Sequence, residues 1–211
     1  IADLHIEDFP VSWEQLPHAL GCADAMAADA PLLHGTRAGN VMVEGLVCKG
    51  DAPGALNEAA HVVERSFSTP FIEHAYIEPE AGWAVRDDDT ITIHASTQAP
   101  HMDRDAMAAI MDLPVEQVRI VPTACGGGFG SKLDISMQPY IAIAAWQLKR
   151  PCGIVYTRQE SMRSSTKRHP SEIRLKAGCD ADGRITGFDF KGYFNTGAYA
   201  SWGPTVANRV P

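Results

Sequence analysis

The stretch Cys125-Gly126-Gly127-Gly128-Phe129-Gly130-Ser131-Lys132 lies between a short apolar strand, 118–121, and a long apolar helix predicted to end near Arg150. Glycine has no Cβ, so it permits positive φ angles and lets another group approach the backbone closely. Ser131 is a candidate helix N-cap, with Asp134 in a position typical of a capping box. A helix that starts here would present free N–H groups to an anion. The residues alone leave open a ligand-binding loop and a tight structural turn.

The known phosphate-binding loops do not fit this stretch. A Walker A loop needs Gly-Lys followed by Ser or Thr, whereas Ser131 separates Gly130 from Lys132. The dinucleotide fingerprint would require glycine at position 131 or 133, and these positions hold Ser131 and Leu133. Any ligand of this loop is therefore expected to bind in another way.

On both sides of the glycines, the pattern of apolar and polar residues predicts an α+β fold with mixed sheets and packed helices, forming part of a larger domain. We expect a domain boundary at 50–54, where Gly, Asp and Pro punctuate the chain. The most regular alternation predicts a β-hairpin that turns at Asp180–Gly183. The expected helices are 20–30, 55–64 and 100–112, and the expected strands are 40–48, 71–85, 90–95, 153–157, 172–177 and 184–194.

Composition excludes several classes of protein. The 211 residues have 45% hydrophobic and 21% charged side chains, which is typical of a globular chain and not of a disordered one. The net charge of −8 argues against broad nucleic-acid binding, which needs a basic face. The opening residues do not resemble a signal peptide, and no apolar stretch approaches the ~20 residues that span a bilayer. We therefore expect a soluble chain cut from something longer, without a membrane partner.

The five cysteines, Cys22, Cys48, Cys125, Cys152 and Cys179, are widely spaced, and none forms a Cys-x-x-Cys pair. A zinc ribbon or ferredoxin-type cluster in this chain is therefore not predicted. We expect reduced thiols in a cytoplasmic compartment, mostly as small buried hydrophobic residues. Cys125 lies beside the glycines, but no partner histidine for a nucleophile is identifiable.

Two further features have an ordinary interpretation. His74 and Glu78 have the i, i+4 spacing of a helical metal site, but their segment is β-leaning and ends at Pro79. Residues 149–176 hold eight Lys and Arg against two Glu. A solvated face is the favoured interpretation of this basic run, with an anionic ligand or an acidic neighbouring domain as alternatives.

Three ordered motifs resemble the molybdopterin-binding region of the xanthine oxidase family of molybdenum hydroxylases. They are Ser96-Thr97-Gln98, the stretch Gly126–Lys132, and Arg168-His169-Pro170. The separation of Gln98 from Phe129 is similar as well, and residues 73–79 resemble the family's His…Glu-Pro strand. The resemblance covers nearly the whole chain. It implies that 1–50 is the tail of a preceding flanking domain with a connector and that 51–211 is the first part of the molybdopterin-binding domain.

The resemblance also implies roles for single residues. Gln98 would hydrogen-bond an oxo ligand of molybdenum or the nearby pterin, and Phe129 would lie with Gly130 at the metal centre. The catalytic assignment is thus Gln98 and Phe129, and the cofactor-binding assignment is Gln98, Gly127, Gly128, Phe129, Gly130 and Ser131. No side chain of this chain would ligate the metal. The family's general-base glutamate is expected beyond Pro211.

Leu133 is the expected substrate-pocket residue, because purine-oxidising members of the family carry a glutamate at that place. An apolar pocket suits an aldehyde better than a purine. The implied activity is hydroxylation of an aldehyde to a carboxylic acid with water, with electrons leaving through iron–sulfur clusters in other domains. The implied cofactor is molybdopterin cytosine dinucleotide with molybdenum, and the implied assembly is a homodimer.

Three alternatives stay open at the level of sequence. Two belong to the same family, a purine or N-heterocycle hydroxylase and a carbon monoxide dehydrogenase-like subunit. The third belongs to another class, a non-catalytic nucleotide-binding module that uses the same glycine loop.

Overall fold

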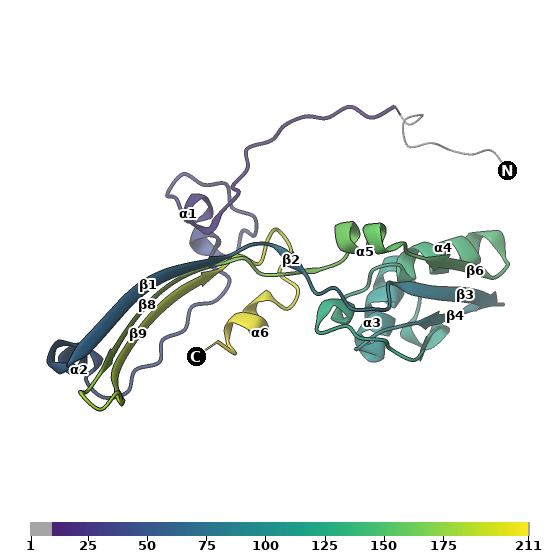
Figure 1. Ribbon diagram of the computed structural model, residues 1–211. Coiled ribbons are helices and arrows are strands. Elements are labelled where there is room, and N and C mark those ends of the chain that lie inside the picture. The colour runs from purple at the N-terminus through teal and green to yellow at the C-terminus, as the bar shows by residue number, and fades with distance from the viewer. Residues whose placement is uncertain (1–9, 211) are drawn as a thin grey trace. The chain divides into compact units, whose positions relative to one another are not determined.

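The computed structural model describes residues 10–210 and divides the chain into two compact units (Figure 1). One unit combines residues up to 66 with residues from 173 onward, and the other comprises residues 67–172. The predicted boundary at 50–54 and the assignment of 1–50 to a flanking domain stay predictions. Both units mix helices with sheets, so the predicted α+β class is confirmed.

The first unit contains a three-stranded sheet in the order β1-β8-β9, made by β1 (His61–Thr69), β8 (Ser171–Cys179) and β9 (Ile185–Phe194). The predicted hairpin is β8 and β9, and Asp180 shapes its turn by accepting the backbone N–H of Asp182 at 3.0 Å and of Arg184 at 2.9 Å. Helix α2 (Ala52–Glu58) starts at its N-cap Asp51 and buries Leu56 against the sheet. Short helices α1 (Cys22–Ala25) and α6 (Gly203–Ala207) complete this unit, with a 3-10 turn at Ala38–Asn40.

Three expectations in this unit are wrong in extent or kind. The predicted helix 20–30 is reduced to α1, and the predicted helix 55–64 ends at Glu58 because Ala59 is extended. Residues 40–48 form no strand, although their side chains favour one. A β-favouring pattern forms a strand only where a neighbouring strand accepts its backbone hydrogen bonds.

The second unit is built on a four-stranded sheet in the order β5-β4-β3-β6. Strands β3 (Ala81–Asp87), β4 (Thr90–Ala95) and β6 (Cys152–Val155) pair antiparallel, whereas β4 and β5 (Val118–Pro122) are parallel. A parallel pair needs a long crossover, and the predicted helix 100–112 provides it as α3 (Pro100–Met111). The 3-10 turn Val115–Gln117 joins α3 to β5.

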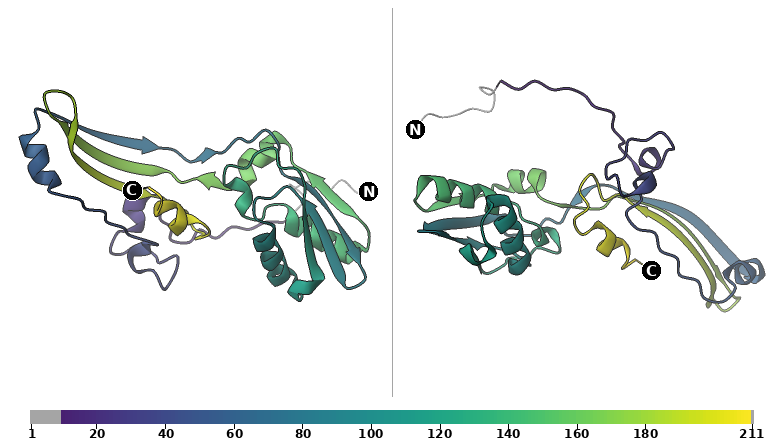
Figure 2. Two further views of the ribbon diagram at one scale, coloured as in Figure 1. Left: turned by 90° about the horizontal axis from the view of Figure 1, so that it is seen from below. Right: turned by 180° about the vertical axis from the view of Figure 1, so that it is seen from behind.

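The core of this unit lies between the sheet and the two helices α3 and α4 (Gln138–Leu148), as Figure 2 shows from two sides. Ile91 and Ile93 of β4 are fully buried and belong to one apolar cluster with Met107 of α3 and Ile141 of α4. This cluster holds the carboxyl ends of β4 and β5 side by side. The segments that follow these two strands are 96–99 and 123–132, and they contain the motifs of interest.

Two shorter elements complete the second unit, a ladder of β2 (Ile72–Glu73) with β7 (Lys167–Arg168), and helix α5 (Arg158–Ser164). Helix α5 starts with a capping box between Thr157 and Glu160. The predicted strand 71–85 is wrong as one element, because irregular chain separates β2 from β3. That irregular segment, 74–80, packs against the glycine-rich stretch.

Candidate functional site

The glycine loop, defined here as residues 126–131, follows β5 and has an irregular backbone. Gly127 and Gly130 have φ angles of +108° and +102°, which side-chain-bearing residues rarely adopt. Phe129 has a φ of +53°, and its ring is 74% exposed. A bulky residue with left-handed backbone is uncommon and requires support from the surrounding structure. The loop is therefore held in its conformation by contacts with its neighbours.

Each of the three consecutive glycines lies against a different neighbour. A Cβ at position 126 would lie 2.7 Å from Cβ of Glu78, and one at position 128 would lie 2.4 Å from Oε1 of Gln98. A Cβ at position 127 would lie 3.2 Å from Cβ of Tyr76. The run Gly126-Gly127-Gly128 is therefore explained by close packing on three sides.

Gln98 contacts the loop through its side chain and its backbone. Its Oε1 accepts the backbone N–H of Gly130 at 2.9 Å, and its own backbone N–H donates to the carbonyl of Lys132 at 2.9 Å. Because a backbone N–H can only donate, this contact assigns the orientation of the amide. The Nε2 group of Gln98 then has no acceptor among the described residues.

An ion pair between the buried Lys132 and the partly exposed Glu78 closes the loop at both ends. The carboxylate oxygen Oε2 of Glu78 accepts the N–H of Gly126 at 2.7 Å, the hydroxyl of Ser96 at 2.8 Å and Nζ of Lys132 at 2.8 Å. The side chain of Lys132 is 3% exposed, and its Nζ also donates to the carbonyl of Glu78 at 3.0 Å and to Ser96 at 3.1 Å. Its ammonium lies 4.6 Å from the centre of the Tyr76 ring.

Burial by itself would raise the pKa of the Glu78 carboxyl. The hydrogen bonds from Lys132, from the Gly126 N–H and from Ser96 outweigh burial, so the pKa is lowered below its ordinary value. Glu78 is therefore a carboxylate at neutral pH and forms a charged pair with Lys132. Removing Glu78 would be costly, because it leaves the Lys132 charge buried without its partner.

The hydrogen bonds of the loop divide its backbone N–H groups into two sets. Gly126 donates to Glu78, Gly130 to Gln98, and Ser131 to the carbonyl of Gly128 at 2.9 Å. The three consecutive N–H groups of Gly127, Gly128 and Phe129 have no acceptor within residues 10–210. Successive free N–H groups in such a turn form a concave binding site for anions and other acceptors.

Ser131 and the following helix differ from the prediction. The Ser131 hydroxyl caps no helix and instead donates to the carbonyl of Thr166 at 3.1 Å, so a capping box with Asp134 is wrong. Residues Ser131–Leu133 form one 3-10 turn, and α4 starts only at Gln138 with Pro139 in its first turn. Proline is favoured there, and the extended Asp134 breaks any earlier helix. No long helix therefore begins at the glycines.

A second buried ion pair lies in the β2–β7 ladder of the same unit. Nζ of Lys167 lies 2.7 Å from Oε2 of Glu73, and both side chains are about one-tenth exposed. The Ser165 hydroxyl donates to Glu73 at 2.6 Å and accepts from Lys167 at 3.0 Å. None of these contacts involves residues 126–132. The pair corrects the interpretation of the basic run as a solvated face, at least for Lys167.

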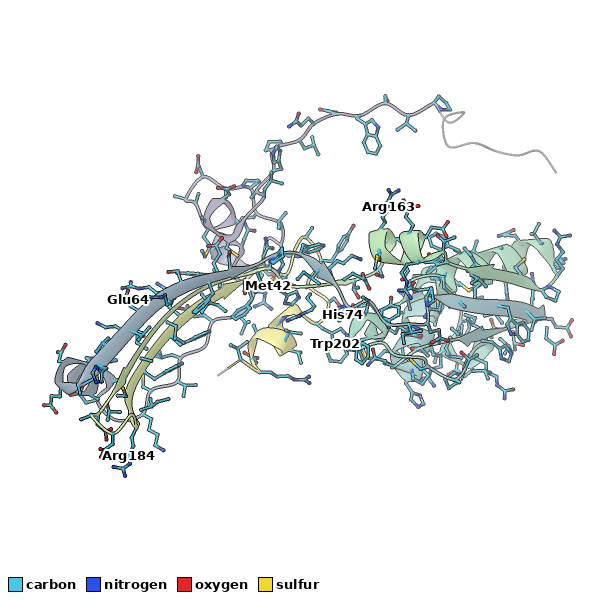
Figure 3. The ribbon with its side chains drawn as sticks, in the orientation of Figure 1. Met42, Glu64, His74, Arg163, Arg184 and Trp202 are labelled. Atoms are coloured by element: carbon cyan, nitrogen blue, oxygen red, sulfur yellow. The ribbon has the colours of Figure 1, made fainter. Side chains whose placement is uncertain are left out.

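Two histidines accompany this ladder, and one of them, His74, is labelled in Figure 3. Burial lowers the pKa of His74 although Glu73 opposes the shift, and burial with the nearby His74 lowers the pKa of His169. Nδ1 of each ring is buried without a hydrogen-bond partner among the described residues. His74 and Glu78 do not lie on a helix, so the spacing of a helical metal site has no structural basis here.

The structure brings together most of the residues singled out in the sequence. Gln98, Gly128 and Gly130 are in contact, Ser131 closes the turn, and the N–H of Leu133 donates to the carbonyl of Gly130 at 3.4 Å. Sequence reasoning missed the roles of Glu78, Ser96 and Lys132 in holding the loop. A lysine directly after a glycine-rich turn was the available signal, but nothing local identified its partner.

The cysteines and possible metal sites add little to this site. Cys48, Cys125, Cys152 and Cys179 are free thiols, but Cys48 and Cys125 are exposed, so the expectation of buried cysteines is wrong for these two. Within residues 10–210, no group of three or more His, Cys, Asp or Glu side chains is placed to hold a metal ion. No helix in the same range is long and apolar enough to cross a membrane.

Asp103 of α3 supports the segment that carries Gln98. Its side chain is 1% exposed, and its Oδ2 accepts from Nε2 of Gln138 at 3.1 Å. Burial raises the pKa of Asp103 above its ordinary value of 3.8, although hydrogen bonds from Thr97 and Gln138 oppose the shift.

The raised pKa of Asp103 predicts a pH-dependent stability. The stabilising contribution of the neutral carboxyl is present below pH 3.8 and is lost as the pH rises through the folded-state pKa. Asparagine at position 103 has no carboxyl to ionise, so the variant does not lose this stability. The free energy of unfolding of Asp103→Asn, relative to wild type, should therefore increase from pH 4 toward neutrality. Urea unfolding at several pH values checks this, with Asp105→Asn, 61% exposed on the same helix, as the control. A constant difference between Asp103→Asn and wild type across this range would contradict the prediction.

Comparison with known proteins agrees with this geometry. A family model of the molybdopterin cofactor-binding domain matches residues 33–211. The chain is 36% identical over 97% of its length to the nicotinate dehydrogenase large molybdopterin subunit of Eubacterium barkeri, and it covers 48% of that protein. It is 37% identical over 98% of its length to a probable xanthine dehydrogenase subunit of Bacillus subtilis (strain 168), covering 28% of that protein.

Among solved structures, the aldehyde oxidoreductase of Desulfovibrio gigas matches with a TM-score of 0.81 and 27% identity. The match covers 93% of this chain and 22% of that one. The chain thus spans less than half the length of each of these three relatives. It belongs to the molybdopterin cofactor-binding domain family, within the molybdenum-binding region of the xanthine oxidase family of molybdenum hydroxylases.

Proposed function

We propose that the glycine loop and Gln98 bind the molybdenum cofactor of an aldehyde-oxidising hydroxylase. The observation that supports this most is the set of three adjacent free N–H groups at Gly127, Gly128 and Phe129. An anionic, bulky cofactor needs several donors on a surface without side chains in its way. The loop offers both, because glycine at 127 and 128 leaves two of these N–H groups without a Cβ beside them.

The division of the N–H groups refines the expected roles within the loop. Gly127, Gly128 and Phe129 have donors available for the cofactor. Gly130 and Ser131 already donate within the protein, so they shape the loop rather than donate to a ligand. The exposed ring of Phe129 is available to pack against the cofactor or the substrate.

Gln98 contributes one directed donor. The N–H of Gly130 holds Oε1, which leaves Nε2 to donate to an acceptor atom of the cofactor. When bound, the molybdenum cofactor supplies the two-electron oxidation of the substrate. The protein's part at this position is to fix the orientation of the group that it binds.

Leu133 supports an aldehyde as the substrate. It lies two residues after the loop and has an apolar side chain where purine-oxidising relatives of the family are expected to carry a glutamate. A pocket that lacks a polar partner discriminates against a purine, because the polar ring atoms would be left unpaired. Oxidation of an aldehyde to its carboxylic acid is therefore the proposed reaction.

A purine or N-heterocycle hydroxylase is the second candidate. It is favoured by the names of the two relatives, a nicotinate dehydrogenase and a probable xanthine dehydrogenase. We expect the full-length protein to turn over benzaldehyde with a larger kcat/KM than hypoxanthine or nicotinate. Steady-state kinetics with the three compounds checks this, and a preference for either heterocycle would favour the second candidate.

The remaining expectations belong to the same proposal. The cofactor is proposed to be the cytosine dinucleotide form, and electrons would pass to iron–sulfur clusters in other domains or subunits. A homodimer in the cytoplasm is the proposed assembly and location. A carbon monoxide dehydrogenase-like subunit and a non-catalytic nucleotide-binding module stay alternatives, and only the module predicts a protein without molybdenum.

If the glycine loop binds the cofactor, Gly128→Val should lower the cofactor content of the protein. A side chain at this position would enter the space of the Gln98 amide, so the loop and Gln98 could not keep their positions. We expect about one molybdenum and one CMP per chain in the wild type and a large loss of both in the variant. Metal analysis and acid hydrolysis of the full-length protein check this. Gly45→Val is the control, because no atom lies within 4 Å of a Cβ there. Equal molybdenum content in both variants would contradict binding of the cofactor by the glycine loop.

The directed donor predicts a selective effect of Gln98→Ala. The variant loses the proposed Nε2 donor and also the bond that Oε1 accepts from the Gly130 N–H. Because one such bond is worth about 1.5 kcal/mol, kcat per bound molybdenum should fall at least about 10-fold without unfolding of the protein. Kinetics normalised to molybdenum content check this, with the exposed Gln159→Ala on α5 as the control. Unchanged turnover at full loading would contradict a role for Nε2.

A further inference from the structure

Glu78, Ser96 and Lys132 form a hydrogen-bonded cluster at the two ends of the glycine loop, named here the loop clamp. We propose that these three residues are positioning residues for cofactor binding: they hold the glycine loop so that the N–H groups of Gly127, Gly128 and Phe129 stay free and face one ligand. This deepens the proposed function and rests on it. None of the three residues needs to touch the cofactor itself.

The geometry of the clamp is that of a closed ring. Glu78 binds the start of the loop at Gly126 and the residue after its end, Lys132, through one carboxylate oxygen. The loop ends are thus fixed to one atom. Fixing both ends of a short segment removes most of its conformational freedom before a ligand binds.

Each hydrogen-bond donor in the side chains of the clamp has an acceptor. The ammonium of Lys132 has three protons, and its Nζ lies near three acceptors, the carbonyl and carboxylate of Glu78 and the hydroxyl of Ser96. Ser96 accepts from Lys132 and donates to Glu78, so it links the two charges. A buried network in which every donor is satisfied is rigid.

The clamp also makes one backbone N–H group, that of Gly126, unavailable to a ligand. Because Glu78 takes the N–H of Gly126, the first free donor is that of Gly127. Without the carboxylate, the backbone at Gly126 would be free to rotate. The positions of the three free N–H groups that follow it would then no longer be fixed. The clamp therefore preorganises the binding surface, which lowers the entropic cost of cofactor binding.

The second ion pair of the unit offers a matched control. Glu73, Ser165 and Lys167 repeat the arrangement of the clamp, with a buried Lys–Glu pair and a serine hydroxyl that donates to the glutamate and accepts from the lysine. None of these three side chains contacts residues 126–132 directly, but Thr166, which lies between Ser165 and Lys167, hydrogen-bonds Ser131 at the end of the loop. A general loss of stability would follow from breaking either pair, whereas the larger loss of loop order should follow from breaking the clamp, which contacts both ends of the loop.

The test uses Ser96→Ala against Ser165→Ala, and Lys132→Met against Lys167→Met, in the full-length protein. Each variant is made in a host with molybdenum cofactor and in a host unable to synthesise it. Hydrogen–deuterium exchange of the peptide covering 126–132 is measured on the cofactor-free protein, and molybdenum per chain is measured on the loaded one. The serine variants leave no charge unpaired, so they keep the test valid where a lysine variant fails to fold.

We expect exchange in 126–132 to become at least about 10-fold faster in Ser96→Ala, from loss of a hydrogen bond to a charged group, and to change much less in Ser165→Ala. Molybdenum per chain should fall in the clamp variants alone. Equal effects of the two serine variants, or unchanged loop exchange in Ser96→Ala, would overturn the proposal. A wild type without molybdenum would overturn the proposed function, while faster loop exchange in Ser96→Ala alone would still support the clamp as the holder of the loop.

Discussion

The contact between the carboxylate of Glu78 and the two ends of the glycine loop is the constraint on which the site depends. Its two partners in the loop region, the Gly126 N–H and Lys132, are brought there by different elements, one after β5 and one in a 3-10 turn. The apolar core beneath holds β4 and β5 in parallel register, so that the segments following them meet. Loop shape, free donors and the Gln98 orientation all follow from this arrangement.

The close packing around the loop gives its sequence a physical meaning. Glycine at 126 makes room for Glu78, glycine at 127 for Tyr76, and glycine at 128 for Gln98. Each neighbour restricts the backbone of one glycine. Two of the three free donors of this loop belong to glycines, so only the exposed ring of Phe129 accompanies them, which suits a large anionic cofactor. Family membership and geometry therefore lead to the same functional class.

Local patterns predicted the elements whose hydrogen bonds are local. The hairpin β8–β9 with its turn at Asp180 and helix α3 were predicted closely, because their periodicity and end signals lie within the segments themselves. The strand expected at 40–48 and the helix expected after Gly130 were wrong. The first lacks a neighbouring strand, and the second is interrupted by the extended Asp134, although Pro139 marked its true start. The partners of Glu78, which lie far along the chain, had no local signal.

The most direct test of the account is a crystal structure of the full-length protein with its molybdenum cofactor bound. The account predicts hydrogen bonds to the cofactor from the N–H groups of Gly127, Gly128 and Phe129 and from Nε2 of Gln98. It also predicts that Glu78 keeps its contacts with Gly126 and Lys132. A cofactor bound to the N–H groups of Gly130 and Ser131, or a loop released from Glu78 in the loaded protein, would contradict it.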